Sequence, residues 1–307
     1  MTTYLVTGAA GFIGGALARR LAATGARVIG VDNFSNASRA SVPDGIEFIE
    51  ADLAEPGIPD RLPQEIDVIM HLAGQASGEN SYHEPLRDLQ ENAASTINMI
   101  QLGRKAGISR LVFASSISCY GEAGGTALKE SDPLNPKSCY AIAKIAAENY
   151  VRMFAEEVPS VIFRLVNTYG PGQNMANMNQ GMISIFLAQA LKSGRVQVKG
   201  SLDRYRDFLF VEDCVDAWIA AAENDRAIGQ TMNLGTGRKT TVGELLAAMK
   251  IHIPAMEWYV EGSTPGDSTG HFADTTRLRE VLGFKASTTL TDGLAPFIEW
   301  ARREFTA

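Results

Sequence analysis

The chain has 307 residues, enough for one large domain or two smaller ones. Its hydrophobic content of 45%, charged content of 21% and net charge of -7, with no cluster of Lys and Arg, are ordinary for a globular protein and argue against a nucleic acid or an anionic membrane as the partner. There is no apolar run that could span a bilayer and no basic signal-peptide region, and the three cysteines lack metal-site spacing, so we expect a cytoplasmic protein with reduced thiols and no metal.

Short runs rich in β-branched residues alternate with helical stretches in the first half of the chain. The pattern predicts strands at 4–7, 27–31, 47–49, 68–72, 110–114 and 161–166, and helices at 12–24, 84–106 and 138–158. Such alternation is typical of a parallel sheet covered on both faces. Right-handed crossovers then give a doubly wound α/β fold of the Rossmann type.

The rhythm changes after residue 166. The segment 170–207 is rich in Gly, Asn and Gln around one helix near 183–192, whereas 208–230 resembles a return to the first domain. We therefore predict a first domain made of 1–166 plus 208–230. A smaller, discontinuous C-terminal domain, made of 167–207 plus 231–307, would cap the sheet.

A glycine-rich turn, Gly8, Gly11 and Gly14, separates the first predicted strand from the first helix. Glycines allow a tight turn and close approach to a pyrophosphate, and the helix N-terminus adds free N–H groups. Asp32 ends the next strand, where a carboxylate suits the two ribose hydroxyls and repels a 2′-phosphate, so NAD is favoured over NADP. The alternative is that the glycines form an ordinary turn and Asp32 caps a helix, in a fold that binds no nucleotide. That alternative does not explain why strand, turn, helix, strand and acid follow one another in this order.

Tyr140 and Lys144 are four residues apart on a predicted helix and therefore share a face. An ammonium group beside a tyrosine favours the phenolate, which can take a proton from a sugar hydroxyl as hydride leaves the carbon. Ser116 follows the fifth predicted strand, at the same sheet edge, and can hydrogen-bond the same oxygen. The Tyr-x-x-x-Lys spacing usually marks a solvated helix face, but its place after an NAD turn favours a catalytic pair.

These motifs resemble those of the extended short-chain dehydrogenases/reductases, in the nucleotide-sugar epimerase/dehydratase family. The matching segments follow the family's order over nearly the whole chain: 7–14, 32–35, 71–74, 115–121, Tyr140 with Lys144, 164–171, 206–208 and 233–237. The resemblance implies that the first domain binds NAD and that the second binds a nucleotide sugar. It also implies a homodimer formed by the helices at 84–106 and 138–158.

The resemblance also assigns individual residues. Those implied to contact NAD are Gly8, Gly11, Phe12, Ile13, Gly14, Asp32, Asn33, Ser35, Asp52, Leu53, Leu72, Ala73, Gly74, Asn92, Tyr140 and Lys144. Those implied to contact a UDP-sugar are Ser116, Ser118, Asn167, Gln197 and Arg206. The family often has Arg where Thr264 stands, as a second diphosphate ligand, which leaves Arg206 as the main one.

Enzymes of this family begin by oxidising the sugar at C4 to a ketone, and three outcomes follow. Hydride returned to the other face gives an epimerase; loss of water across C5 and C6 with hydride returned to C6 gives a 4,6-dehydratase; the same loss with hydride returned to C4 gives a 5,6-unsaturated sugar. Typical 4,6-dehydratases carry Thr-Asp-Glu where this chain has Ser116, Ile117 and Ser118. Ile117 and Ser118 supply neither the acid nor the base, so that outcome is disfavoured.

Cys119 and Glu122 are the residues that leave the choice between the other two outcomes open. A thiol and a carboxylate near the sugar can serve as an alternative base and acid, although Cys119 also suits packing and Glu122 suits a loop. Our leading hypothesis is NAD-dependent 5,6-dehydration of a UDP-hexosamine of the UDP-N-acetylglucosamine type, as in tunicamycin-type nucleoside-antibiotic assembly. The alternatives are a UDP-hexose 4-epimerase and a non-catalytic NAD-binding regulator, the last disfavoured by the presence of Tyr140 and Lys144.

Overall fold

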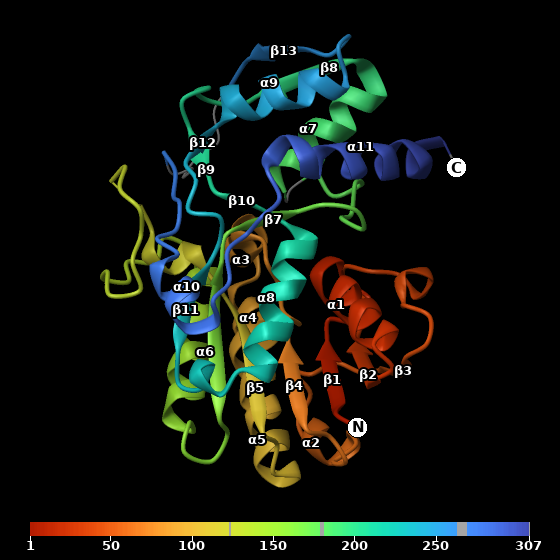
Figure 1. Ribbon diagram of the computed structural model, residues 1–307, viewed down its shortest axis with the longest axis vertical. Coiled ribbons are helices and arrows are strands. Elements are labelled where there is room, and N and C mark those ends of the chain that lie inside the picture. The colour runs from red at the N-terminus through yellow and green to blue at the C-terminus, as the bar shows by residue number, and fades with distance from the viewer. Residues whose placement is uncertain (123, 179–180, 263–268, 307) are drawn as a thin grey trace.

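The computed structural model describes residues 1–122, 124–178, 181–262 and 269–306 (Figure 1). Seven parallel strands form its central sheet, in the order β11-β6-β5-β4-β1-β2-β3. They are β1 (Thr3–Thr7), β2 (Arg27–Asp32), β3 (Glu47–Glu50), β4 (Val68–His71), β5 (Arg110–Ser116), β6 (Ser160–Leu165) and β11 (Thr231–Leu234). The strand order turns back between β1 and β4, as expected of the doubly wound fold, and such sheets bind ligands at the carboxyl ends of their strands near that point.

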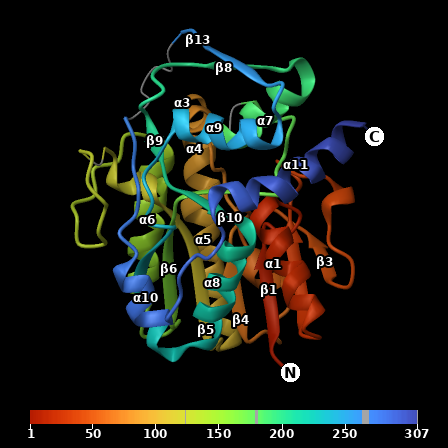
Figure 2. The ribbon, with the colours of Figure 1, turned by 45° about the horizontal axis from the view of Figure 1, so that its top comes forward.

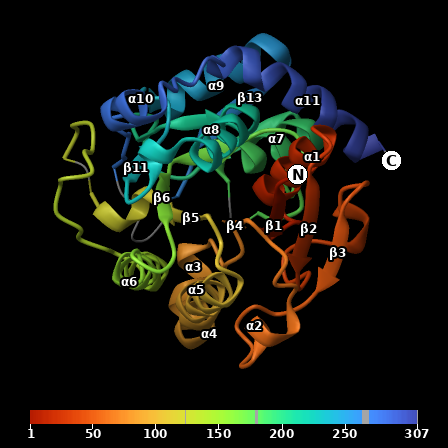
Figure 3. The same cartoon turned by 60° about the horizontal axis from the view of Figure 1, so that its bottom comes forward.

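Helices cover both faces of this sheet (Figure 3). Helices α1 (Phe12–Ala23) and α8 (Val211–Glu223) lie on one face, and α2 (Ile58–Arg61), α5 (Ser95–Ala106) and α6 (Cys139–Met153) lie on the other. Successive side chains of a strand point to opposite faces, so Leu5 and Val6 belong to two different buried hydrophobic clusters. Burial on both faces explains why the strands are continuous apolar runs in the sequence.

Three predicted elements differ from the structure by more than one residue or in the type of helix. The helix predicted over 84–106 consists of α4 (Pro85–Leu89), a π-helical turn η2 (Gln90–Ala94) and α5. Helix α6 ends at Met153, because the chain turns over 154–157 to enter β6. Strand β5 continues two residues beyond the prediction, because Ser115 and Ser116 still pair with β6.

The remaining elements gather mainly beyond the carboxyl ends of the strands, at the top of Figure 1 and turned forward in Figure 2. The main ones are α7 (Met182–Ser193), α9 (Val242–His252) and α11 (Leu290–Thr306), with the parallel pair β8 (Arg195–Val198) and β13 (Glu257–Val260). Two further pairs are β7 (Asn167–Tyr169) with β10 (Phe208–Phe210) and β9 (Tyr205–Arg206) with β12 (Thr240–Thr241). The shorter helices are α3 (Gly78–His83), α10 (Thr276–Leu282), η1 (Arg39–Ser41), η3 (Ile117–Tyr120) and η4 (Asp225–Ala227).

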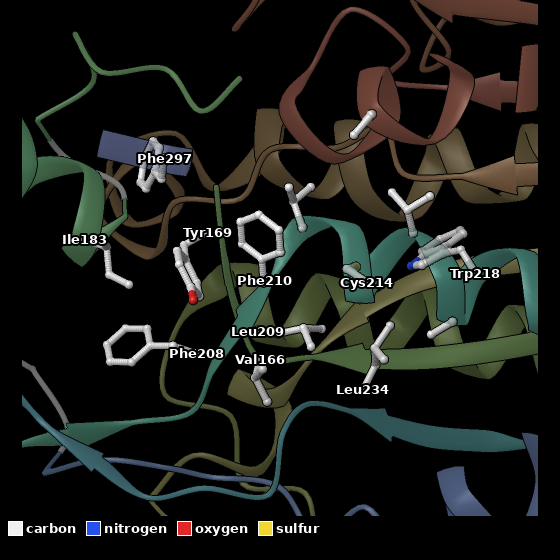
Figure 4. Close-up of a cluster of buried hydrophobic side chains, with 14 of the residues drawn as sticks. Val166, Tyr169, Ile183, Phe208, Leu209, Phe210, Cys214, Trp218, Leu234 and Phe297 are labelled. Atoms are coloured by element: carbon white, nitrogen blue, oxygen red, sulfur yellow. The ribbon is translucent and has the colours of Figure 1, made fainter. Parts of the chain in front are cut away.

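One part of the predicted domain division does not agree with this sheet. Strand β11 lies after the predicted boundary at residue 230, yet it pairs with β6 as the edge strand of the large sheet. The two parts of the chain also share a core around Tyr169, whose ring lies 5.6 Å from that of Phe210 and 6.4 Å from that of Phe297 (Figure 4). This packing joins β7 and β10 to α11.

Candidate active site

A cavity of about 1040 Å³ lies at the carboxyl ends of the central strands. It is lined by the glycine-rich turn, by the ends of β2, β4 and β5, by the start of α6 and by residues of the second part of the chain. Its volume is at the upper end of the roughly 300–1,000 Å³ usual for a small-molecule site, which suits an extended ligand or two adjacent ones.

The glycine-rich turn has the geometry that a dinucleotide requires. Gly8 adopts a left-handed φ of 69°, and a Cβ added at Gly14 would lie 2.1 Å from the Gly8 carbonyl oxygen. The N-cap of α1 is Gly11, which has no side chain to cap the first-turn N–H groups. These N–H groups, with the positive end of the helix dipole, fit a pyrophosphate.

Asp32 lines the same cavity at the end of β2. Its Oδ2 accepts a hydrogen bond from Ala10 N at 3.1 Å, and its Oδ1 accepts one from Phe34 N at 2.8 Å. The carboxylate therefore braces the glycine-rich turn and shapes the loop after β2. Each oxygen has a further lone pair with which to accept a ribose hydroxyl.

The end of β4 is held by a buried polar link. His71 Nδ1 lies 2.8 Å from Thr7 Oγ1, and Thr7 Oγ1 accepts hydrogen bonds from the N–H groups of Leu72 and Ala73, each at 3.0 Å. Burial, together with the charge of Lys144, lowers the pKa of His71 to about 3. His71 is therefore neutral and positions the loop that follows β4.

Tyr140 lies at the start of α6, which Ser138 caps by accepting a hydrogen bond from Ala141 N. Burial raises the pKa of Tyr140, and a hydrogen bond with Ser116 opposes the rise. Ser118 Oγ donates to Ser116 Oγ at 2.8 Å, so the two serine hydroxyls and the phenol form one chain. Because the resting tyrosine is a poor base, it needs a positive charge close by to react as a phenolate.

Lys144 supplies that charge one helical turn later. Its Nζ lies 5.9 Å from the centroid of the Tyr140 ring and 5.1 Å from that of Phe113. Its side chain lines the cavity and is buried, and burial lowers its pKa to about 8. A lysine in this state keeps most of its charge at neutral pH while remaining able to lose a proton.

The structure brings most of the sequence-predicted NAD residues together on the cavity wall. All of them except Asn92 line it: Gly8, Gly11, Phe12, Ile13, Gly14, Asp32, Asn33, Ser35, Asp52, Leu53, Leu72, Ala73, Gly74, Tyr140 and Lys144. Asn92 is buried behind the loop that follows β4 and donates hydrogen bonds to Gln75 O and to Asp88. Asn92 therefore supports this loop, and its contact with NAD stays a prediction.

Of the residues predicted to contact the sugar nucleotide, Ser116, Ser118 and Asn167 line the cavity. Arg206 does not, although it is buried next to His271, which does. Gln197 lies on β8 and donates to Glu261 at 3.4 Å, away from the lining. Thr264 lies outside the described residues.

Cys119 and Glu122 do not line the cavity either. Cys119 is fully buried, its Sγ 3.6 Å from Ser115 Oγ and 3.8 Å from Ala141 O. Burial raises the pKa of Cys119 to about 11, so it stays a thiol. Glu122 is exposed in the loop after η3. Neither side chain is placed to exchange a proton with a molecule bound in the cavity.

Several cavity residues were not foreseen. His271 follows Gly270, which forms a β-bridge with Tyr205, and its Nε2 is buried without a hydrogen-bond partner among the described residues. Trp300 and Glu304 reach the cavity from α11, which extends toward the loop after β2 (Figure 2). No local pattern marks these residues, because only the packing of α11 and of the segment around His271 brings them to the wall.

No described helix is both long and apolar enough to cross a membrane. Nor does any group of three or more His, Cys, Asp or Glu side chains, within the described parts of the chain, have the arrangement of a metal site.

Comparison with known proteins places these features in context. The model of the NAD-dependent epimerase/dehydratase family matches residues 4–235. A UDP-glucose 4-epimerase of Mycolicibacterium smegmatis is 35% identical over 312 residues, which cover 98% of each chain. A crystal structure of a Thermotoga maritima UDP-glucose 4-epimerase with UDP-glucose has 30% identity and a TM-score of 0.94, covering 99% of this chain and all of the other. TunA, an NAD-dependent NDP-hexosamine 5,6-dehydratase involved in tunicamycin biosynthesis, has 27% identity and a TM-score of 0.89, covering 99% and 98%.

Proposed function

The chain belongs to the NAD-dependent epimerase/dehydratase family, and we propose that within it the protein acts as a UDP-hexose 4-epimerase. One observation carries this choice over the 5,6-dehydratase. The segment 115–118 beside Tyr140 presents hydroxyls and the apolar Ile117 to the cavity, whereas Cys119 and Glu122 are absent from its lining.

Epimerisation requires only one acid–base group of the protein. NAD, held by the glycine-rich turn and Asp32, would supply the hydride acceptor and donor for the sugar carbon. Tyr140, as the phenolate, takes the proton of the sugar hydroxyl and gives it back to the same oxygen. Ser116 hydrogen-bonds that oxygen, and the ammonium of Lys144 stabilises the phenolate. A 5,6-elimination needs in addition a base for the C5 proton and an acid for the leaving hydroxyl.

Residues on the side of the cavity away from the glycine-rich turn support a nucleotide-sugar substrate. Asn167 offers an amide, and His271 offers a buried nitrogen without a described partner. Arg206, buried beside His271, adds positive charge behind that wall. We assign the diphosphate to this side because a buried positive charge there compensates an anion.

The likeness to UDP-glucose 4-epimerases at 35% and 30% identity supports the proposal, while the likeness to TunA keeps the 5,6-dehydratase as the second candidate. The test is to incubate the enzyme separately with UDP-glucose and UDP-N-acetylglucosamine in deuterated water and to analyse the products by NMR and mass spectrometry. We expect an isomer of unchanged mass whose C4 configuration is inverted. Loss of water with vinyl signals would overturn the epimerase and favour the dehydratase.

A second arm tests the same choice through the protein. We expect Cys119→Val with Glu122→Gln to turn over at the wild-type rate and Tyr140→Phe to lose turnover while still binding NAD. Loss of activity in the double variant, with folding intact by circular dichroism, would restore the two residues to the chemistry.

We also propose that the protein forms a homodimer through α4 and α6. Five large apolar side chains of these helices are exposed: Leu86, Leu89, Ile142, Tyr150 and Met153. Exposed apolar side chains that gather on neighbouring helices mark an interaction surface. In sedimentation experiments we expect the wild type to be a dimer and Ile142→Glu to be a monomer. A monomeric wild type would refute the assignment.

A further inference from the structure

A buried polar cluster of Gln75, Asp88 and Asn92 lies behind the loop that follows β4. Asp88, on α4, is 1% exposed. Its Oδ1 accepts hydrogen bonds from Gln75 Nε2 at 2.8 Å and from Asn92 Nδ2 at 3.0 Å. Its Oδ2 is buried and accepts none from the described residues. A buried carboxylate oxygen without a partner is costly, so its retention calls for a reason.

The cluster borders Lys144 through Gly74. A Cβ added at Gly74 would lie 3.4 Å from Lys144 Nζ and 2.5 Å from Asn92 Oδ1, so both side chains approach the same side of the glycine backbone. Helix α4 and the turn η2, which carry Asp88 and Asn92, both pack against α6, which carries Lys144. Asn92 Oδ1, like Asp88 Oδ2, is buried without a described partner. At least one buried acceptor of the cluster, Asn92 Oδ1, therefore lies on the side toward Lys144.

Two carboxylates act electrostatically on Lys144, and only one has its charge already matched. Glu148 forms ion pairs with Arg164 at 2.7 Å and Arg152 at 2.5 Å. Asp88 has no ion pair of 4 Å or less among the described residues. Arg87, which lines a small polar cavity with Asp88, pairs instead with Glu84 and Glu91.

The other titratable groups around Lys144 carry no charge that could take the place of Asp88. His71, on β4, is neutral because burial lowers its pKa to about 3. Cys119, in η3, stays a thiol because burial raises its pKa to about 11. Tyr140, on α6 itself, is neutral in the resting site since burial raises its pKa.

We propose that Asp88 is a positioning residue that acts through Lys144, its unmatched carboxylate keeping the buried ammonium charged so that Lys144 can stabilise the Tyr140 phenolate. The proposal rests on the proposed roles of Tyr140 and Lys144. An opposite charge favours the protonated lysine, whereas burial disfavours it. The same negative charge also acts on Tyr140, where it opposes the phenolate. The net benefit must therefore come through Lys144, and the two routes predict different pH profiles.

The substitution to use is Asp88→Asn, which keeps the shape and one acceptor oxygen for Gln75 and Asn92 but removes the charge. The matched control is Glu84→Gln, an exposed carboxylate on the N-cap of the same helix. The pKa of Lys144 is measured by NMR titration of lysine labelled with ¹³C at Cε, its signal assigned by its loss in Lys144→Met. Thermal unfolding of each variant shows whether it folds.

We expect Asp88→Asn to lower the pKa of Lys144 from about 8 by about one unit and Glu84→Gln to leave it unchanged. In kcat/KM profiles the limb set by Lys144 should move to lower pH by the same amount while the limb set by Tyr140 stays in place. An unchanged Lys144 pKa in a folded Asp88→Asn variant would overturn the proposal, as would a shift only of the limb set by Tyr140, which would indicate action on that residue. The NMR result does not depend on turnover, so it stands even if the epimerase assignment fails.

Discussion

Gly14→Ala is expected to break NAD binding, because the glycine-rich turn has no room for a methyl group. The new Cβ would lie 2.1 Å from the oxygen and 2.7 Å from the carbon of the Gly8 carbonyl, both backbone atoms. Since carbon–oxygen contacts relax to about 3.3 Å, the turn and the start of α1 must separate by about 1 Å. Overpacking of this kind costs about 1–3 kcal/mol of folding free energy. A 1 Å misplacement of binding groups costs on the order of 100-fold in function.

The assay is isothermal titration with NAD, alongside urea unfolding of the apoprotein. We expect the Kd for NAD to rise by about 100-fold. The control is Gly243→Ala in α9, where an added Cβ would be no closer than 3.8 Å to its neighbours. It should bind NAD normally and gain about 0.4–1 kcal/mol of stability, because alanine loses less chain entropy on folding. Wild-type affinity in a folded Gly14→Ala variant would refute the idea that the tight turn forms the pyrophosphate site.

Two further predictions concern charge. Asp32→Ala should weaken NAD binding and reduce the preference for NAD over NADP, because the carboxylate accepts a hydrogen bond from Ala10 N and would repel a 2′-phosphate. Equal discrimination between NAD and NADP by the variant and the wild type in paired titrations would contradict the assignment of Asp32 to the ribose. Burial alone would raise the pKa of Glu148, but Arg164 and Ser115 outweigh burial and hold this pKa below its usual range. The ionised carboxylate therefore stabilises the fold at pH values above the unfolded-state pKa. This contribution is lost as the pH falls through the lower pKa of the folded state. Glu148→Gln should therefore cost about 3–5 kcal/mol at pH 7, and less at acid pH, in urea unfolding; a cost that does not depend on pH would show that the ion pair is not its source.

Local sequence signals predicted which residues of the glycine-rich turn and of the next strand lie together at the sheet edge, for a physical reason. A strand, a glycine turn, a helix and a terminal acid are all close in sequence, and their geometry follows from backbone rules. The structure accordingly gathers Gly8, Gly14 and Asp32 on one wall. Tyr140 and Lys144 are equally local, because one helical turn fixes their relation. The parallel, doubly wound sheet followed from the alternation of strands and helices and from the handedness of the crossovers.

The substrate half depends on contacts between distant segments, which periodicity does not encode. His271 and Trp300 reach the cavity only because the segment near β9 and helix α11 fold back over the sheet edge. For the same reason the sequence pattern places β11 in the C-terminal domain instead of the large sheet. The sequence of these four residues, Thr231–Leu234, does not indicate which strand they pair with. The early end of α6 and the longer β5 are set by pairing and by a turn, which propensity does not fix.

The segment from Ser116 to Glu122 shows most clearly what residue type alone leaves open. From the sequence alone, Cys119 can be either a reactive thiol or a packing residue, and its position in η3 decides between these roles. There Sγ contacts Ser115 and Ala141 O on the side of α6, whereas Ser116 and Ser118 bond to each other at the cavity. The choice between inverting a centre and eliminating water thus depends on which side chains of one short turn face the sugar. Asp88, the carboxylate that we propose acts on Lys144, lies on a different helix, where neither spacing nor motif marks it.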